Sequence, residues 1–376
     1  MPTVSVIIPS YNHERFIEEC IQSVLNQTFQ DFEIIITDDA SIDRTVELIE
    51  QFKDSRIKLF RHLKNKGASI ATNNCITHAQ GKYIAMLSSD DAWYPEKLAI
   101  QVEYLEQHPE IRAVFGKVDW VDERGQPITN KIFPHKEAFD VSNRTRFEWL
   151  NYFFYRGNCL CHPCSLVRRE CYQEIGFLNP AFANIPDFDL WIRLCLHYEI
   201  TILDHKLIRF RRMADESNAS GDTNTSRIRN RFEHRHALNN YLQITDTEDF
   251  LRVFPESINY GPVTSDTIPF LLGQMAIKNI DKGMEFAALW GLDLIYNSLQ
   301  NEKTAKNLEK NFNFTHRNFI ELSGKCDPFR VSILFPTSRP SLVFQQSVIR
   351  IFLSATKEYA RAIEFIIARL LLATKK

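Results

Sequence analysis

Two acidic pairs stand directly after apolar runs in the first 90 residues of this 376-residue chain. Asp90 and Asp91 come after Tyr83–Leu87, and Asp38 and Asp39 come after an earlier run of the same kind. Carboxylates at the end of a buried strand are costly unless a cation or a hydrogen-bond donor faces them. Hard divalent cations take carboxylate and phosphate oxygens, so such a pair could hold a metal ion together with a diphosphate. The alternative for Asp91 is capping of the helix that starts near residue 95.

Strand and helix patterns alternate through this first region. The apolar runs that predict strands are Val4–Ile8, which Pro9 ends, Phe32–Thr37, Ile57–Phe60 and Tyr83–Leu87. The segments with helical spacing between them are Glu14–Leu25, Thr45–Phe52 and Ala68–Ala79. Strands that alternate with helices over short connections predict a doubly wound, mostly parallel α/β sheet flanked by helices.

The rest of the chain continues this pattern and then changes to helices. The predicted elements are a helix Glu96–Gln107, a strand Ala113–Val121, a turn at Asp122–Gly125, a helix at 145–155, a strand Ser165–Arg168, a helix that ends at Gly176, a helix Phe188–His197 and one or two strands in Ile200–Arg211. Ala214–Ser226 is polar and reads as a loop, which predicts a domain boundary. We therefore expect a first domain over 1–215 and a mainly helical region over 216–376.

The turns that follow the first four strands carry polar side chains. These turns are Pro9-Ser-Tyr-Asn12, Asp38-Asp-Ala-Ser41, Asn65-Lys-Gly67 and Ser89-Asp-Asp91. Because the carboxyl ends of parallel strands meet at one edge of a sheet, we expect all four turns to line one cleft. Carboxylates, amides, a phenol and free backbone N–H groups in one cleft are typical of a nucleotide pocket.

The motifs in and around these turns resemble those of the family 2 glycosyltransferases. The segments that carry the resemblance are Val4-Ser-Val-Ile-Ile-Pro-Ser-Tyr-Asn12, Ser23-Val-Leu-Asn-Gln-Thr28, Phe32-Glu-Ile-Ile-Ile-Thr-Asp-Asp39, Asn65-Lys-Gly67 and Ser89-Asp-Asp91. The resemblance covers roughly residues 3–215. It implies the GT-A fold and transfer of a sugar from a nucleotide diphosphate, usually a UDP-sugar, with inversion at the anomeric carbon.

The resemblance also implies roles for individual residues. Pro9 and Tyr11 would line the base and the ribose, and Asp39 would accept the uracil N3–H. Asp91 would bind Mg²⁺ or Mn²⁺ directly, with Asp90 beside it, and the metal would neutralise charge on the departing diphosphate. The further nucleotide-binding residues expected from the turns are Asn12, Asn65 and Gly67. The alternative for Asp38 and Asp39 is an Asx-turn or a cap of the helix at Thr45.

The segment Ile185-Pro-Asp-Phe-Asp-Leu-Trp-Ile-Arg193 resembles the family's acidic motif, which commonly reads Glu-Asp-x-Asp-Leu-Trp. The match makes Asp187 the base that takes the proton of the acceptor hydroxyl, and Asp189 a support of the local structure. Pro186 stands where the family often has Glu. The alternative for Asp187 is an N-cap of the helix at 188–197, and both roles can coexist.

Two other positions depart from the family pattern, and two arginines and a Cys-rich segment offer further candidate contacts. Thr72 and Met213 stand where the family often has Arg and His, and Arg211 and Arg212 could supply positive charge to the diphosphate instead. The alternative is that Arg211 and Arg212 lie on a strand and face the solvent. In the segment Cys159-Leu-Cys-His-Pro-Cys164 we expect His162 to contact an acceptor hydroxyl, whereas structural zinc would need a second ligand pair that the spacing does not supply.

Composition bears on partners and location. The net charge of −2 gives no indication of nucleic-acid binding, but residues 301–376 hold 13 Lys and Arg against 6 Asp and Glu. Val348–Leu372 has an apolar stripe flanked by basic residues, which fits a helix on an anionic membrane surface. The alternative is packing on its own domain or on a second subunit. Eight cysteines without a disulfide-scaffold spacing predict reduced thiols.

These observations predict a cytoplasmic enzyme, peripheral on the inner face of the plasma membrane. The chain enters a predicted strand at Val4, which argues against a signal peptide, and no apolar run reaches the ~18 residues of a membrane span. We expect a metal-dependent inverting glycosyltransferase with a glycan or lipid-linked acceptor in surface polysaccharide or lipopolysaccharide assembly. The alternatives are a non-catalytic nucleotide-sugar-binding module and a sugar-nucleotide pyrophosphorylase.

Overall fold

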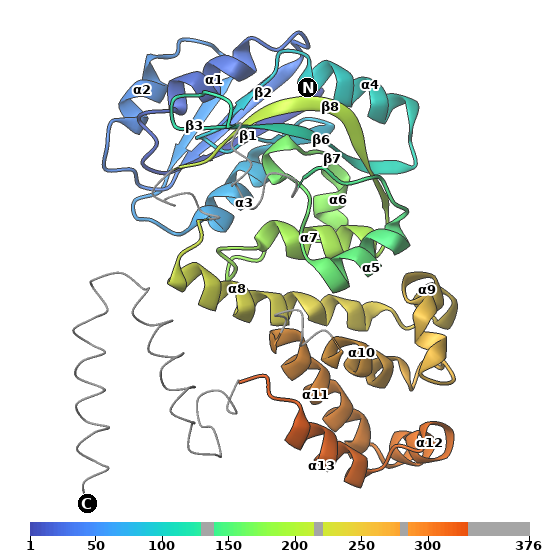
Figure 1. Cartoon of the computed structure of the whole chain (residues 1–376). Coiled ribbons are helices and arrows are strands. Elements are labelled where there is room, and N and C mark those ends of the chain that lie inside the picture. The colour runs from blue at the N-terminus through green and yellow to red at the C-terminus, as the bar shows by residue number, and fades with distance from the viewer. Residues whose placement is uncertain (129–138, 214–220, 279–284, 330–376) are drawn as a thin grey trace, which may run out of the picture. The chain divides into compact units, whose positions relative to one another are not determined.

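A computed structural model describes residues 1–128, 139–213, 221–278 and 285–329 of the chain (Figure 1). Its contacts group the residues into two compact units, Met1–Glu321 and Leu322–Lys376. The first unit is therefore longer than the domain expected to end near residue 215. The predicted membrane-surface helix at Val348–Leu372 lies outside the described residues.

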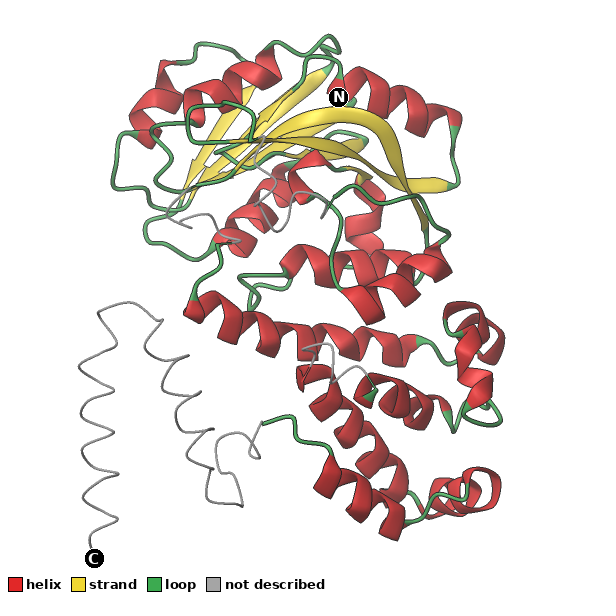
Figure 2. Cartoon of the chain, in the orientation of Figure 1, coloured by secondary structure: helices red, strands yellow, loops and turns green. Residues whose placement is uncertain are grey.

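The first unit contains an eight-stranded sheet with the order β3-β2-β1-β4-β7-β6-β8-β5 (Figure 2). The strands are β1 (Val4–Ser10), β2 (Phe32–Asp38), β3 (Ile57–Arg61), β4 (Tyr83–Met86), β5 (Ala92–Trp93), β6 (Ile111–Val121), β7 (Leu166–Arg168) and β8 (Glu199–Arg211). The predicted strand at Ile200–Arg211 is thus one long strand. The expected stop at Pro9 is wrong, because β1 continues to Ser10 and pairs there with Asp38.

The four strands β3, β2, β1 and β4 are mutually parallel. Residues of β1, β2 and β4 are almost all buried, as expected where helices cover both faces of a sheet. Their carboxyl ends lie at one edge, which is where the four polar turns begin. This part of the predicted fold is confirmed.

The other half of the sheet is mixed. β7 pairs antiparallel with β4 and with β6, β6 and β8 are parallel, and β5 pairs antiparallel with β8 at the sheet edge. The mostly parallel α/β sheet flanked by helices is confirmed, and the antiparallel insertion of β7 is the added feature. Strands as short as β5 and β7 carry too few residues to show a period or a direction in the sequence.

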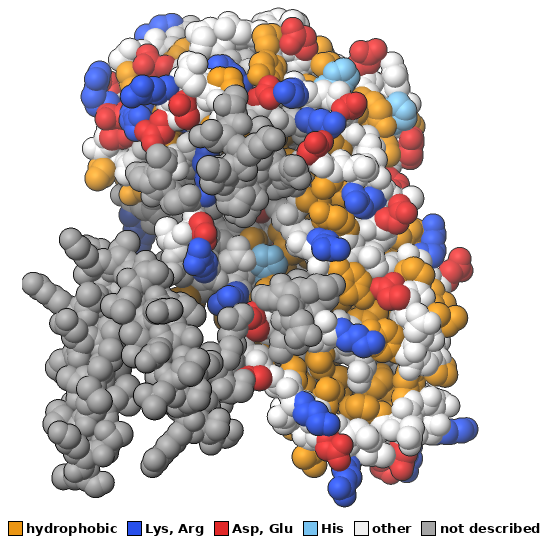
Figure 3. Space-filling model, viewed as in Figure 1, with side chains coloured by type: hydrophobic (Ala, Val, Ile, Leu, Met, Phe, Trp, Pro, Cys, Tyr) orange, Lys and Arg blue, Asp and Glu red, His pale blue; other side chains and the backbone are white. Residues whose placement is uncertain are grey.

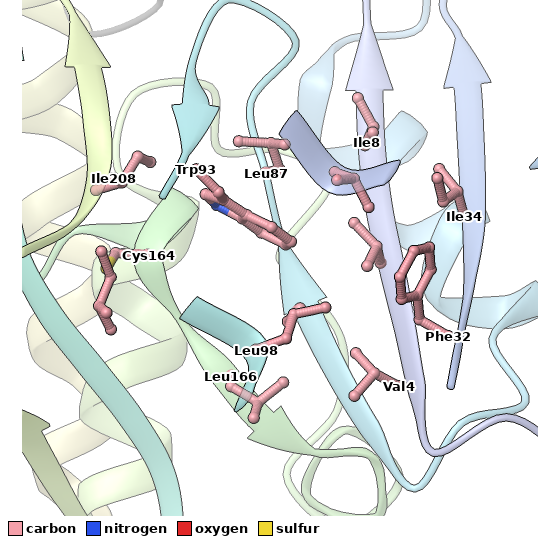
Figure 4. Close-up of a cluster of buried hydrophobic side chains, with 14 of the residues drawn as sticks. Val4, Ile8, Phe32, Ile34, Leu87, Trp93, Leu98, Cys164, Leu166 and Ile208 are labelled. Atoms are coloured by element: carbon pink, nitrogen blue, oxygen red, sulfur yellow. The ribbon is translucent and has the colours of Figure 1, made fainter. Parts of the chain in front are cut away.

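Helices cover both faces of the sheet (Figure 1). On one face lie α1 (Ile17–Leu25), α2 (Thr45–Gln51) and α4 (Lys97–Gln107), and on the other α3 (Ala68–His78), α5 (Arg146–Arg156), α6 (Arg169–Glu174) and α7 (Pro186–Cys195). Buried aliphatic and aromatic side chains from both strands and helices pack together, among them Val4, Phe32, Trp93, Leu98 and Leu166 (Figure 4).

The described residues after 220 are mainly helical, as predicted. The helices are α8 (Asn224–Ala237), α9 (Thr247–Val253), α10 (Ile268–Ile277), α11 (Glu285–Gln300), α12 (Glu302–Phe312) and α13 (His316–Lys325), with 3₁₀ turns at Leu238–Gln243 and Pro255–Asn259. Among the described residues, none of the helices has the length and apolar character of a membrane span.

Candidate active site

Hydrogen bonds join the turns at the carboxyl edge of the sheet. The backbone N–H of Asn12, after β1, donates to Ser41 Oγ at 2.9 Å, and Asn12 Oδ1 accepts the Ile42 N–H at 2.9 Å. On the other side, His13 Nδ1 lies 2.7 Å from Ser89 Oγ in the turn after β4. Asn12 has φ of 52°, a left-handed conformation that Asn tolerates. The turns after β1, β2 and β4 therefore form one connected surface, as the sequence predicts.

Asp39 extends this surface to the turn after β3. Its carboxylate is 2% exposed and accepts the backbone N–H groups of Lys66, at 2.9 Å, and Gly67, at 2.7 Å. His62 Nδ1 lies 2.6 Å from the same carboxylate. The Lys66 N–H also lies 3.1 Å from the second oxygen, so these contacts fix both oxygens of the carboxylate. His62 is a member of the site that the sequence analysis missed.

Asp38 has a different role from its neighbour. Its carboxylate accepts the Ser41 N–H at 2.9 Å and bonds the Ser41 hydroxyl, so it fixes the turn after β2 locally. The Asx-turn alternative is wrong in its detail for Asp38, because an Asx-turn uses the N–H two residues on, whereas Asp38 bonds the N–H three residues on. A cap of the helix at Thr45 is wrong for both residues, because α2 is preceded by Arg44 and has no side-chain cap.

Tyr11, Asn65 and Pro9 lie in or next to these turns. The Tyr11 side chain is 42% exposed, which leaves its ring accessible to a ligand. Asn65 Oδ1 accepts the Gly67 N–H at 3.2 Å, and Gly67, with φ of 94°, precedes the first turn of α3. A positive φ favours glycine at this position. Their contacts with a nucleotide stay predictions.

Asp90 and Asp91 form a buried acidic pair after β4. Asp91 is 3% exposed, and one of its oxygens accepts the backbone N–H of Arg211 at 2.7 Å. Burial first, and then the charge of Asp90, raise the pKa of Asp91 well above its usual value. A nearby cation would lower this pKa by stabilising the charged form, so the pair fits a divalent metal. The capping alternative is wrong, since the residue before α4 is Glu96.

Arg211 holds this acidic turn in place. Its Nε donates to the Asp90 carbonyl at 2.8 Å, its Nη1 to the Asp122 carbonyl at 3.0 Å, and its Nη2 to Glu19 at 2.5 Å. The side chain is buried, so the solvent-facing alternative is wrong for Arg211. Arg212 is partly buried, and its backbone N–H donates to the Val121 carbonyl at 2.9 Å. The predicted contacts of both arginines with a diphosphate stay untested.

Asp187 stands in the first turn of α7. Burial raises its pKa to about 6, and Asn158 Nδ2 donates to one of its oxygens at 2.9 Å. The N-cap alternative is wrong, because the helix starts at Pro186 and the cap position, Ile185, has no side-chain hydrogen bond. A carboxylate with a pKa near neutrality is suited to general-base chemistry. Asp189 is fixed by Arg193 and Asn240, in agreement with a supporting role.

The segment before α7 is held by residues that the sequence analysis did not identify. The Glu233 carboxylate, from α8, is 1% exposed and accepts the backbone N–H groups of residues 183, 184 and 185 at 2.8–2.9 Å. From α3, the Asn73 side chain donates to the Leu178 carbonyl at 2.8 Å and accepts its N–H at 3.0 Å. In the sequence, the only signal is that Glu233 is the single acidic residue of a basic stretch.

The charges of Asp91 and Asp187 both act on the buried Cys161 thiol. Burial raises the pKa of this thiol well above the usual value, and the two charges contribute to the same shift. Both carboxylates are therefore close enough to one thiol to act on it electrostatically. His162 packs at 5.5 Å from the Trp191 ring, and burial lowers its pKa to about 4. Its predicted contact with an acceptor hydroxyl stays a prediction.

Two further features lie outside this site. All eight cysteines are free thiols, and the described residues include no group of three or more His, Cys, Asp or Glu arranged to hold a metal ion. A cavity of about 600 Å³ lies between α5, α9 and the turn at Pro255–Asn259, and shares no residue with the predicted site.

Comparisons with known proteins place these features in a family. The profile of the family described as "Glycosyl transferase family 2" matches residues 5–176. An Escherichia coli protein described as the UDP-Glc:alpha-D-GlcNAc-diphosphoundecaprenol beta-1,3-glucosyltransferase WfgD is 44% identical over 205 residues, which are 54% of this chain and 73% of that protein. The putative glycosyltransferase EpsE of Bacillus subtilis is 32% identical over 51% of this chain and 66% of its own length.

A solved structure shows a similar fold. The S. aureus TarS fragment 1–349, crystallised with UDP-GlcNAc, aligns with a TM-score of 0.53 at 18% identity, covering 78% of this chain and 89% of the fragment.

A further sequence relative, an uncharacterised glycosyltransferase of Methanocaldococcus jannaschii, is 30% identical over 56% of this chain and 71% of its own length.

Proposed function

This chain belongs to glycosyl transferase family 2 and is a glycosyltransferase, and we propose that it transfers a sugar from a UDP-sugar to a lipid-linked acceptor, with inversion and with the help of Mg²⁺ or Mn²⁺. The observations that carry the proposal are the buried Asp91, fixed by the Arg211 backbone N–H after β4, and Asp187, fixed by Asn158 at the start of α7. One carboxyl suits a metal on the leaving diphosphate, and the other suits a base for the attacking hydroxyl.

We name the turns after β1, β2, β3 and β4 the sugar-donor side of the site. Asp39 supports binding of the uracil ring here, because backbone N–H groups fix its carboxylate as a negatively charged acceptor among these turns. The exposed Tyr11 offers an aromatic face on the same turn as Asn12. A base held between an aromatic ring and a fixed acceptor would be positioned with its diphosphate near Asp91.

Asp91, with Asp90 beside it, would hold the metal ion. Both side chains offer hard oxygen ligands, and the raised pKa of Asp91 reflects a buried charge that a divalent cation would stabilise. A bound metal supplies Lewis-acid stabilisation of the negative charge that forms on the departing diphosphate. Arg211 keeps the pair in place through the Asp90 carbonyl and the Asp91 carboxylate.

We name residues 158–164 and 178–187 the acceptor side. Asp187 would take the proton of the attacking hydroxyl, and its pKa of about 6 leaves it mostly ionised near pH 7 while still basic enough to accept that proton. Asn158 and backbone N–H groups at the start of α7 fix the orientation of this carboxylate. His162 lies on the same side and is proposed to contact the acceptor.

The acceptor class and the pathway come from the relatives. The E. coli relative is described as acting on a GlcNAc-diphosphoundecaprenol with UDP-glucose. We propose by analogy a diphosphopolyprenol-linked sugar as acceptor, and a role in polysaccharide assembly at the inner face of the plasma membrane. Family membership weighs against a sugar-nucleotide pyrophosphorylase. The transfer experiment below distinguishes an enzyme from a non-catalytic binding module.

The test is sugar transfer by the purified chain from a panel of UDP-sugars to GlcNAc-diphosphate carrying a short alkyl chain. We expect transfer that needs Mn²⁺ or Mg²⁺, stops with EDTA and inverts the anomeric configuration of the product. Asp91→Asn should abolish the metal dependence of UDP-sugar binding, measured by calorimetry. Glu110→Gln is the control, since Glu110 is an exposed carboxylate just before the amino end of β6.

Binding of UDP-sugar without any transfer or hydrolysis would favour the non-catalytic module. Equal turnover by wild type and Asp187→Asn would contradict the assignment of the base, and metal-independent turnover would contradict the role of Asp91.

A further inference from the structure

Helix α8 carries two large apolar side chains that point into solvent. Ile228 is 71% exposed and Phe232 is 60% exposed. They are four residues apart, so they lie on the same side of the helix, one turn from each other. The opposite side carries the buried Glu233 and Ala237 and faces the protein. Burial of the helix on one side thus leaves an apolar pair on the other.

Basic side chains flank this pair. With 3.6 residues per turn, Arg227, Arg231 and Arg235 fall on one side of Ile228 and Phe232, while Arg229 falls on the other. We name these six residues the α8 outer face. Glu233 is the only acidic residue of the helix, and it is buried. On the face shown in Figure 3, basic side chains lie over the part of α8 that this view exposes.

Only part of this positive charge is neutralised by the protein. Arg227 pairs with Asp222, and Arg235 pairs with Asp293 of α11. Arg229 reaches the Asn184 amide at 3.5 Å, and neither Arg229 nor Arg231 forms an ion pair with a carboxylate of the described residues. The surface therefore combines an apolar centre with uncompensated cations at its margin.

We propose that the α8 outer face docks on the surface of an anionic phospholipid bilayer. A surface helix with an apolar centre and basic margins inserts its apolar side chains at the level of the headgroups, while the cations bind lipid phosphates. Arginine can do so by bidentate hydrogen bonds. The proposal concerns a surface distinct from the C-terminal segment at 348–372.

Charge disfavours the other occupants of this face. A second copy packed by the same face would bring four arginines against four arginines, because a two-fold interface pairs a surface with itself. Residues 345–376 of this chain carry six Lys and Arg against two Glu, so they too are of the wrong sign. A bilayer with anionic lipids is complementary to the whole face.

The position of α8 gives such docking a consequence for the site. The same helix that presents the outer face fixes residues 183–185 through Glu233, directly before Asp187. A helix with its side chains is about 10 Å across, so a docked α8 holds the start of α7 close to the headgroups. If the proposed lipid-linked acceptor is correct, its sugar-diphosphate would reach the site from that surface.

The test is flotation of the full chain with phosphatidylcholine vesicles, with and without phosphatidylglycerol. Wild type should bind only the anionic vesicles. Arg229→Gln/Arg231→Gln should lose about 25-fold in apparent affinity, because each basic residue near an anionic surface contributes about fivefold. Ile228→Ser/Phe232→Ser should lose at least about tenfold. Ile258→Ser, at a site that is 68% exposed, and Lys303→Gln/Lys310→Gln are the matched controls and should bind as wild type.

Melting temperatures and UDP-sugar hydrolysis should be unchanged in Ile228→Ser/Phe232→Ser, since both side chains are exposed and lie outside the catalytic site. Vesicle binding needs no turnover, so failure of the proposed function would leave this test intact. Equal vesicle binding by wild type and both α8 variants would overturn the proposal. A change from dimer to monomer in sedimentation, without a change in vesicle binding, would also overturn it and identify a protein interface.

Discussion

Asp39 and Asp187 are both carboxylates of the proposed site, but contacts of different range position them. Asp39 is held by the backbone of the next turn, at Lys66 and Gly67, which the motifs of a parallel sheet place beside it. The loop before Asp187 is held by Glu233, 46 positions further along the chain. The sugar-donor side is therefore built from neighbouring turns of one sheet, whereas the acceptor side depends on helices outside the sheet.

This difference suggests that the two sides can be disturbed separately. Substitutions on the sugar-donor side should change binding of the nucleotide. Substitutions on the acceptor side should change the rate of transfer from a bound UDP-sugar. Kinetics in which kcat and the KM for UDP-sugar are measured separately can therefore test the division.

The largest effect is expected for Asp187→Asn. Loss of the base should lower kcat by about 100-fold or more, while the KM for UDP-sugar stays within about twofold. Because burial raises the pKa of Asp187 from 3.8 to about 6, the charged carboxyl costs folding stability as the pH rises from about 4 through 6. The variant should thus gain about 1–2 kcal/mol at pH 7.5, after allowance for partial exposure, measured by urea unfolding. A loss of stability would indicate a structural role instead.

The pH dependence of kcat in the wild type should reveal the ionisation of Asp187. At saturating Mn²⁺, kcat should fall about tenfold per pH unit below pH 6, since protonated Asp187 cannot accept the hydroxyl proton. Residual hydrolysis by Asp187→Asn should be flat over this range. UDP-sugar binding at each pH is the control that separates this effect from protonation of Asp91. A profile without a break between pH 5 and 7 would contradict the assignment.

The sequence predicted the sugar-donor side better than the acceptor side for a physical reason. Asp39, Asn65 and Asp91 follow apolar strands, and parallel strands bring such positions to one edge whatever the details of packing. Glu233 and Asn158 act through tertiary contacts between elements that no local pattern relates. Glu233 also lies beyond residue 215, where the loop composition predicted a separate domain.

Arg211 shows the same limit within a motif. Its sequence position suggested a ligand contact or solvent exposure, but the side chain is buried against three carbonyls and Glu19. Only the pairing of β8 with β5, a strand of two residues, brings it to the Asp90–Asp91 turn. Similarly, the three residues of β7 are too few for the sequence to indicate that this strand runs antiparallel to its neighbours.

Glu233→Gln tests the acceptor side from a distance. The amide of Gln would place an N–H group against backbone N–H groups of residues 183–185, so at least one hydrogen bond is lost in a buried place. We expect kcat to fall about 10- to 30-fold, an unchanged KM for UDP-sugar and a loss of about 1–3 kcal/mol in unfolding free energy. Glu256→Gln is the control, since Glu256 also accepts side-chain hydrogen bonds, from Tyr155 and Asn151. A raised KM with unchanged kcat would contradict the division.

Asp39→Asn tests the sugar-donor side. The amide can keep an oxygen toward the Gly67 N–H but loses an acceptor for the base of the nucleotide. We expect the KM for UDP-sugar and the Kd for UDP to rise about tenfold, with kcat at saturating UDP-sugar unchanged. Asp38→Asn serves for comparison, because it should lose stability through the Ser41 turn. Equal UDP affinity for wild type and Asp39→Asn would show that Asp39 only fixes the turn.

The smallest effect, and the sharpest comparison, is expected for two neighbours on α3. Asn73 bonds the Leu178 backbone on the acceptor side, whereas Asn74 donates to Thr37 Oγ1 of β2 at 3.0 Å. Asn73→Ala removes two hydrogen bonds to the segment that leads to Asp187, so kcat should fall about three- to tenfold with an unchanged KM for UDP-sugar. Asn74→Ala should leave kcat unchanged and raise that KM by about twofold at most. If both variants lose kcat equally, α3 supports the whole site. The sugar-donor side and the acceptor side could then not be disturbed separately through this helix.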